Sequence, residues 1–167
     1  MEQLGIILLL FVVALIIGVV INKRTAATAL EGVSFVLAYP PSLVAAALDK
    51  THNKGTAAAI RGAFGGVSVV AVANKAFAYQ SKFGDQGQIV ITSDPAGAHV
   101  QARTTNLYVG APQKMLNTSS TGIWALSVAI THGLYRLAGV TPGAANMKRW
   151  QNALQGRVTR EITKATA

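Results

Sequence analysis

The chain has 167 residues, of which 51% are hydrophobic and only 13% are charged, about half the charged share of an ordinary soluble domain. Its 15 Lys and Arg against 6 Asp and Glu give a net charge of +9, and a mean hydropathy of +0.39 excludes a disordered basic tail. The lack of Cys excludes a disulfide scaffold, a thiolate zinc site and a Cys nucleophile. This length allows one ordinary domain plus a membrane anchor.

An apolar stretch near the start of the chain predicts that anchor. Residues 4–21 carry no charge and end at Asn22-Lys23-Arg24. As a helix they would be about 27 Å long, close to the thickness of a bilayer core, and apolar all round. The anchoring side chains are expected to include Leu4, Ile7, Leu10, Phe11, Leu15, Ile17 and Val20.

Two other interpretations of this stretch are a buried core helix and a cleaved signal peptide. A chain this small rarely surrounds a helix completely, and a signal peptide would have basic residues where this chain has Glu2. The nearest cleavage motif is AATA, just after Arg24. Because Lys23 and Arg24 follow the stretch directly, the positive-inside rule places the rest of the chain on the cytoplasmic side, unless a second span reverses it.

The Ala-rich segment 25–83 is expected to be helical and close to the membrane. A short surface helix is expected over residues 42–52, where Asp49 and His52 indicate a solvated helix end more than a metal pair, because no third ligand follows. A second helix is expected over residues 56–73, where Gly62 and Gly66 have the spacing of close helix packing. This helix could span the bilayer or lie along its surface, and Arg61 near its middle disfavours the span.

From Gly84 the residue pattern changes to short β-type runs separated by turn residues, which predicts a small antiparallel domain. Trp124, Leu126, Val128 and Ile130 alternate with smaller residues, so a half-buried strand with Trp124 in the core is expected there. The expected strands cover residues 88–92, 98–102, 107–111, 124–130 and 133–140.

Part of this region resembles PEGA-type β domains. Residues 91–100, ITSDPAGAHV, are similar to the opening S-x-P-x-G-A-x-V motif. Residues 108–112, YVGAP, are similar to the G-x-T-P signature with Ala111 at the Thr position, and residues 124–135 resemble the closing strand with its Gly-Tyr end. The resemblance implies a non-catalytic, membrane-tethered interaction or spacer module, usually outside the cytoplasm, which conflicts with the orientation derived from charge.

The tail, residues 145–167, is expected to form a basic amphipathic helix. Its apolar positions are Met147, Trp150, Leu154, Val158 and Ile162, at steps of three or four. The helix could pack on the β domain, bind an anionic membrane surface or contact nucleic-acid phosphate. Its candidate anion-contacting residues are Lys148, Arg149, Arg157, Arg160 and Lys164.

Catalysis has little support in the sequence. The acidic residues are scattered, and His99 and His132 have the setting of ordinary polar residues. No cofactor or metal is therefore expected. The prediction is an α+β membrane protein with an anchor (1–24), a helical membrane-proximal region (25–83) and a small β domain closed by a basic helix (84–167).

The favoured function is a structural or assembly protein of a cellular envelope or a membrane-containing virion. Its expected partners are the lipid bilayer, other membrane or assembly proteins and further copies of itself. A membrane-tethered nucleic-acid binder and a holin-like pore former built from the first 80 residues are the alternatives.

Overall fold

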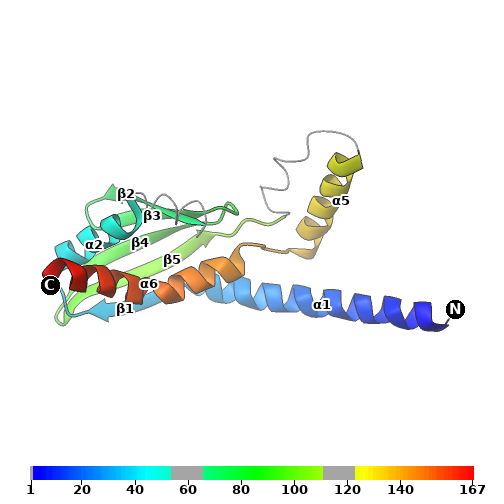
Figure 1. Ribbon diagram of the computed structural model, residues 1–167, viewed down its shortest axis with the longest axis horizontal. Helices are drawn as coiled ribbons and strands as arrows, with labels where there is room; N and C mark the ends of the chain where they lie inside the picture. Colours follow the sequence, from blue (N-terminus) through cyan, green and yellow to red (C-terminus); the bar gives the residue numbers. More distant parts are fainter. Residues whose placement is uncertain (1, 54–65, 111–122) are drawn as a thin grey trace.

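The computed structural model describes residues 2–53, 66–110 and 123–167 (Figure 1). A long helix, α1 (Glu2–Glu31), begins the chain and leads into strand β1 (Val33–Leu37) and helix α2 (Pro41–Asn53). Strands β2 (Val67–Ala73), β3 (Ala76–Ser81), β4 (Gln86–Asp94) and β5 (Gly97–Asn106) follow. Helices α5 (Ile123–Ala138) and α6 (Ala144–Thr166) complete the described chain.

The strands form one five-stranded antiparallel sheet in the order β1-β5-β4-β3-β2. β2 to β5 follow one another as a meander, and β1 is added at the far edge by pairing with residues 98–102 of β5. The β4–β5 hairpin turns through Pro95-Ala96, where Asp94 pairs with Gly97 and its carboxylate accepts a hydrogen bond from the Ala96 N–H. Gly97 has a φ of +135°, which favours glycine at this turn.

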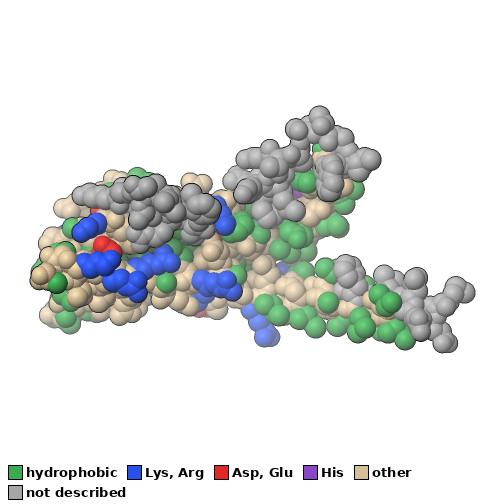
Figure 2. Space-filling model, viewed as in Figure 1, with side chains coloured by type: hydrophobic (Ala, Val, Ile, Leu, Met, Phe, Trp, Pro, Cys, Tyr) green, Lys and Arg blue, Asp and Glu red, His purple; other side chains and the backbone are tan. Residues whose placement is uncertain are grey.

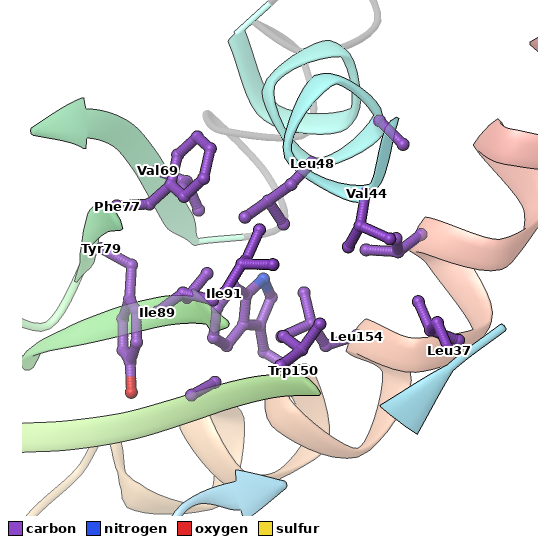
Figure 3. Packing of buried hydrophobic residues seen from close by; sticks show 14 of the residues in the cluster. Leu37, Val44, Leu48, Val69, Phe77, Tyr79, Ile89, Ile91, Trp150 and Leu154 are labelled. Atoms are coloured by element: carbon purple, nitrogen blue, oxygen red, sulfur yellow. The ribbon is translucent and has the colours of Figure 1, made fainter. Parts of the chain in front are cut away.

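Helices α2 and α6 cover one face of the sheet and enclose the core (Figures 1 and 3). Leu48 of α2 and Leu154 of α6 are both fully buried, and they meet inward-facing strand residues such as Ile89 and Ile91. The rings of Tyr79 and Trp150 lie 4.7 Å apart between centroids. The strands alternate buried and exposed residues, so the opposite face of the sheet is open to solvent.

The N-terminal apolar helix, the antiparallel sheet and the C-terminal helix are confirmed. β4 and β5 contain the expected strands 88–92 and 98–102, and α2 contains the expected helix 42–52. The apolar stripe of α6 is buried at all five expected positions.

Four expectations about the fold are wrong. The first is the strand over residues 107–111, because β5 ends at Asn106, residues 107–110 are in no strand, and residue 111 lies outside the described residues. Residues 67–73 form a strand and not the end of a helix, and β1 and β3 also lie in the segment expected to be helical. The expected boundary at Gly84 lies in the β3–β4 connection, so residues on both sides of it belong to one sheet. A fragment starting there would lack β1, β2 and β3.

The fourth error concerns α5. The sequence predicts strands over residues 124–130 and 133–140, but one continuous helix covers residues 123–138, and residues 139–140 follow it outside any strand. The apolar residues from Trp124 to Ile130 alternate at period two, as in a strand. The larger set Leu126, Ile130, Leu134 and Leu137 recurs every three or four residues, as in a helix, and the chain folds with this helical period. The side chain of Trp124 lies outside the described residues, so its expected place in the core stays a prediction.

Candidate functional site

The first two thirds of α1 extend away from the sheet and are the most prominent apolar surface of the molecule (Figures 1 and 2). Ile7 is 66% exposed, and the described large apolar side chains up to Ile21 are nearly all exposed as well. Of the expected anchor residues, Ile7, Leu10, Leu15, Ile17 and Val20 are exposed, whereas the side chains of Leu4 and Phe11 lie outside the described residues. Within the described part of the chain, α1 is the one helix long and apolar enough to cross a membrane.

The exposed part of α1 ends at Asn22, where the body of the protein begins. The Asn22 side chain accepts hydrogen bonds from the backbone N–H (2.8 Å) and hydroxyl (3.0 Å) of Thr141, and its amide donates to the Thr141 carbonyl (3.0 Å). Thr141 lies in the connection between α5 and α6. The first polar residue after the apolar stretch therefore joins α1 to the connection between α5 and α6.

The last turns of α1 pack into the body beside α6. Ala29 is fully buried, and the Lys148 ammonium donates to the carbonyl of Thr28 at 3.2 Å. Gly32, just after α1, has a φ of +77°, and a Cβ there would lie 2.2 Å from the Ala102 carbonyl oxygen. The chain can thus turn from α1 into β1 against β5 only with glycine at this position.

A buried polar network fixes this end of α1. The Gln151 amide of α6 donates to the Ala29 carbonyl (3.0 Å), to the Thr104 hydroxyl (3.0 Å) and to the Tyr79 hydroxyl (3.4 Å). The hydroxyls of Tyr79 and Thr104 are 2.9 Å apart. Burial raises the pKa of Tyr79, because the phenolate would be desolvated, and the hydrogen bonds from Thr104 and Gln151 offset part of that effect.

A buried carboxylate lies beside the start of α6. Asp85 is fully buried, and its carboxylate accepts hydrogen bonds from the Ser81 hydroxyl (2.5 Å) and the Tyr108 N–H (3.0 Å). Gly143 precedes α6, and a Cβ there would lie 1.8 Å from the Asp85 Oδ2 atom. The Asp85 carboxyl group therefore lies against the N-terminal end of α6, and any side chain larger than that of glycine at position 143 would collide with it.

The five basic residues expected to contact anions are all on α6, and Figure 2 shows Lys and Arg side chains gathered over the body. They are spread along the helix, and two of them are engaged within the chain: Lys148 with Thr28, and Lys164 with Glu161 at 3.1 Å. Arg149, Arg157 and Arg160 are exposed.

Gly66, one of the two glycines expected to pack helices together, is not in a helix: it has a φ of +78° and precedes β2. The other glycine, Gly62, lies outside the described residues. Among the histidines, His99 is hydrogen-bonded to Ser34 across β1 and β5, and His132 lies beside the Tyr108 ring. No group of three or more His, Asp or Glu residues gathers within the described ranges.

The sequence interpretation missed Asn22, Thr141 and the Gln151 network, which together place α1 against the body. Asn22 could have been noticed as the first polar residue after the apolar stretch. Its partner lies 119 positions away, and no local pattern connects the two. Gln151 lies on the buried side of α6, where a polar residue within an apolar stripe indicates an internal hydrogen-bonding partner.

No protein-family model matches the chain, and no curated protein matches it in sequence. The PEGA-type resemblance therefore depends on its own short motifs and stays a prediction. Its opening motif forms the β4–β5 hairpin, whereas the residues compared with its closing strand are helical in α5.

Proposed function

We propose that the protein is a non-enzymatic, membrane-anchored structural or assembly protein. In this proposal the apolar part of α1 crosses the bilayer, and the sheet with α2 and α6 forms a body that contacts other proteins or further copies of the chain. One observation carries the proposal. The described large apolar side chains of α1 up to Ile21 are nearly all exposed, and α1 is the one helix in the described part of the chain that is long and apolar enough to cross a membrane.

Two features favour a permanent anchor over the alternatives. The core helix of a soluble protein is mostly buried, and α1 is not. A signal peptide is removed, but cleavage after the AATA motif would remove Asn22, with its three hydrogen bonds to Thr141, and the buried Ala29. The end of α1 thus supports the body, and its loss would remove the three hydrogen bonds between Asn22 and Thr141 and one of the hydrogen bonds that the Gln151 amide donates.

The proposal places Asn22 at the membrane interface, with the exposed Lys23 and Arg24 at the level of the lipid phosphates. The basic flank favours a cytoplasmic body, and the PEGA-type resemblance favours the opposite side. We take the cytoplasmic orientation, because the charge rule acts through residues directly beside the span.

This placement separates the basic residues of α6 by depth. Because Thr141 meets Asn22 and Gln151 meets Ala29, α1 and α6 run in the same direction away from the interface. At 1.5 Å per residue, Arg149 lies about 12 Å along α6 from Thr141, Arg157 about 24 Å and Lys164 about 35 Å. With a Debye length of about 8 Å in physiological salt, Arg157, Arg160 and Lys164 are too far from the lipid to contribute much.

The same arrangement disfavours nucleic acid as the main partner. A few exposed arginines on one helix would give non-specific binding on the order of 10⁻⁴ M or weaker at physiological salt. The pore-forming alternative requires the first 80 residues to be helical in the membrane. Residues 67–73 and 76–80 are in strands, which disfavours it. We therefore keep the assembly function.

The test uses the absence of Cys, which allows single thiols to be introduced. Val13→Cys in α1 and Gln86→Cys at the exposed start of β4 are expressed in the full chain, and sealed membranes are treated with a membrane-impermeant maleimide. The Gln86 thiol should react from one side only, and the Val13 thiol should stay unreactive until detergent is added. Modification of the Val13 thiol in sealed membranes would refute the span.

The assembly role is tested by cross-linking in those membranes. Lysine-reactive cross-linking should join the body to a copy of itself or to a defined membrane protein, while the detergent-solubilised full chain should not bind duplex DNA at micromolar concentration in physiological salt. Tight DNA binding that is lost when Arg157, Arg160 and Lys164 are changed to Gln would replace the assembly role with nucleic-acid binding.

A further inference from the structure

Helix α5 carries a second apolar surface, separate from α1. Leu126, Ile130, Leu134 and Leu137 are 63%, 56%, 59% and 88% exposed, and their spacing of three or four residues places them along one side of the helix. We call these four residues the α5 stripe. No acidic residue lies in α5, and its one Lys or Arg is Arg136 in the last turn.

The other side of α5 lies beside residues 108–110, which follow β5. Val128, Thr131 and His132 are partly buried, and the His132 ring lies 6.5 Å from the Tyr108 ring between centroids. Gly110 is close to His132, because a Cβ on Gly110 would lie 2.5 Å from the imidazole. The contacts of His132 with Tyr108 and Gly110 therefore lie on the side of α5 opposite the α5 stripe, and the α5 stripe faces outward.

The end of α5 is held at the level where α1 leaves the body. Gly139, with a φ of +65°, ends the helix, and the next residue, Val140, accepts a hydrogen bond from the Gly110 N–H at 3.1 Å. Thr141 then makes its three hydrogen bonds with Asn22. If Asn22 lies at the membrane interface, the C-terminal end of α5 lies there too.

The direction of α5 completes the argument. Figure 1 shows α5 and the exposed part of α1 leaving the body on the same side, with α5 at a steep angle to α1. Figure 2 shows hydrophobic side chains on both and Lys and Arg side chains on the body. A helix that lies across the axis of a membrane-spanning helix, at the depth where that helix enters the lipid, lies along the membrane surface.

We propose that α5 is an interfacial helix that inserts the α5 stripe into the same leaflet that α1 enters, so that the protein is held to the bilayer at two places. The proposal rests on the membrane anchor proposed above. An amphipathic helix of this kind buries its apolar side about 5–10 Å into the boundary between headgroups and acyl chains, and Arg136 can extend to the phosphates. A bilayer is favoured over a protein partner because the depth of α5 is fixed by the residue at which α1 leaves the lipid.

The consequence is a fixed orientation of the body. A single spanning helix leaves the attached domain free to rotate and tilt, whereas a second contact in the plane of the membrane restricts both motions. The face of the sheet opposite α2 and α6 would then be presented in one constant direction to proteins assembled beside it.

The test measures the depth of single labels in the full chain, reconstituted in vesicles of phosphatidylcholine and phosphatidylglycerol. An environment-sensitive fluorophore is attached to Val13→Cys in α1, Ile130→Cys in the α5 stripe or Gln155→Cys on the exposed side of α6. Quenching by lipids with nitroxides at shallow or deep acyl positions then reports depth. The labels at positions 13 and 130 should show blue-shifted emission and quenching by deep and shallow nitroxides respectively, while the label at position 155 should show neither.

The outcomes separate this inference from the anchor. A quenched label at position 13 with an unquenched, solvent-exposed label at position 130 overturns the interfacial helix and keeps the anchor, and no quenching at either position overturns both. Blue-shifted emission at position 130 without lipid quenching would overturn the proposal, because it would show that protein and not lipid covers the α5 stripe. Dipolar broadening between spin labels at position 130 would identify that protein as a second copy.

A charge variant controls for the case in which the apolar fluorophore itself draws α5 into the lipid. With the fluorophore moved to Leu137→Cys, Ile130→Glu should lift α5 and abolish quenching by shallow nitroxides, because a carboxylate would have to enter the lipid boundary. Gln155→Glu, which adds the same charge on α6, should leave quenching unchanged. Unchanged quenching in the Ile130→Glu variant would contradict the proposal.

Discussion

Helices α1 and α6 are both long, run side by side from the Asn22–Thr141 junction, and make opposite use of their apolar residues. α6 is polar overall, with one apolar stripe that the sheet and α2 bury completely. α1 is apolar around its whole circumference up to Ile21, and the body covers it only after that point. A small body can cover one side of a helix but cannot surround it, so a helix that is apolar all round requires an apolar medium.

The largest expected effect comes from placing charge in α1. Leu10→Arg together with Val13→Arg should cost about 5–7 kcal/mol of insertion free energy on the scale for central helix positions and release the protein from membranes. The measurement is the fraction retained after alkaline carbonate washing, with Gln155→Arg on α6 as the control that keeps full retention. Complete retention of the double variant would place the anchor elsewhere in the chain.

The next effect compares a leucine in each helix. Leu154→Ala in α6 should lower the free energy of unfolding by about 2–5 kcal/mol, because Leu154 is fully buried between the sheet and α2. Leu10→Ala in α1 removes the same atoms from an exposed position and should leave the unfolding of the body in detergent unchanged. Equal losses in thermal unfolding for the two variants would show that α1 also packs on the body.

A smaller effect is expected at the junction. Asn22→Ala removes three partly buried hydrogen bonds to Thr141 and should cost about 1–3 kcal/mol of unfolding free energy. Thr25→Ala is the matched control, because the Thr25 hydroxyl bonds only to the Ile21 carbonyl within α1. If the two variants unfold at the same temperature, the junction does not hold α1 to the body.

The smallest effect is a pH dependence from the buried network. Burial raises the pKa of Tyr79, so above about pH 10 the unfolded chain loses a proton that the folded protein keeps. Its contribution to stability is present below that pH and should fall by about 1.4 kcal/mol per pH unit as the pH rises toward the raised pKa. Tyr79→Phe should reduce the dependence of unfolding free energy on pH, measured by denaturant unfolding between about pH 9 and 11 to bracket the ordinary tyrosine pKa. An unchanged dependence would assign the loss of stability at alkaline pH to other groups.

The sequence by itself determined the two long helices and the β4–β5 hairpin. Their signals are local: an unbroken apolar stretch in α1, apolar residues every three or four positions in α6, and Pro95 and Gly97 between alternating runs. Such patterns decide which sides of an element are apolar, and burial of the α6 stripe follows directly from them.

The tertiary structure decided what no local pattern could. Residues 67–73 are rich in Val and Ala, compatible with helix or strand, and pairing with β3 made them a strand. Residues 123–138 fitted both periods, and they form a helix whose apolar side faces outward while His132 lies beside Gly110 and Tyr108. The site where α1 leaves the body depends on Asn22 and Thr141, whose 119-residue separation is closed only when the sheet brings α1 and α6 together.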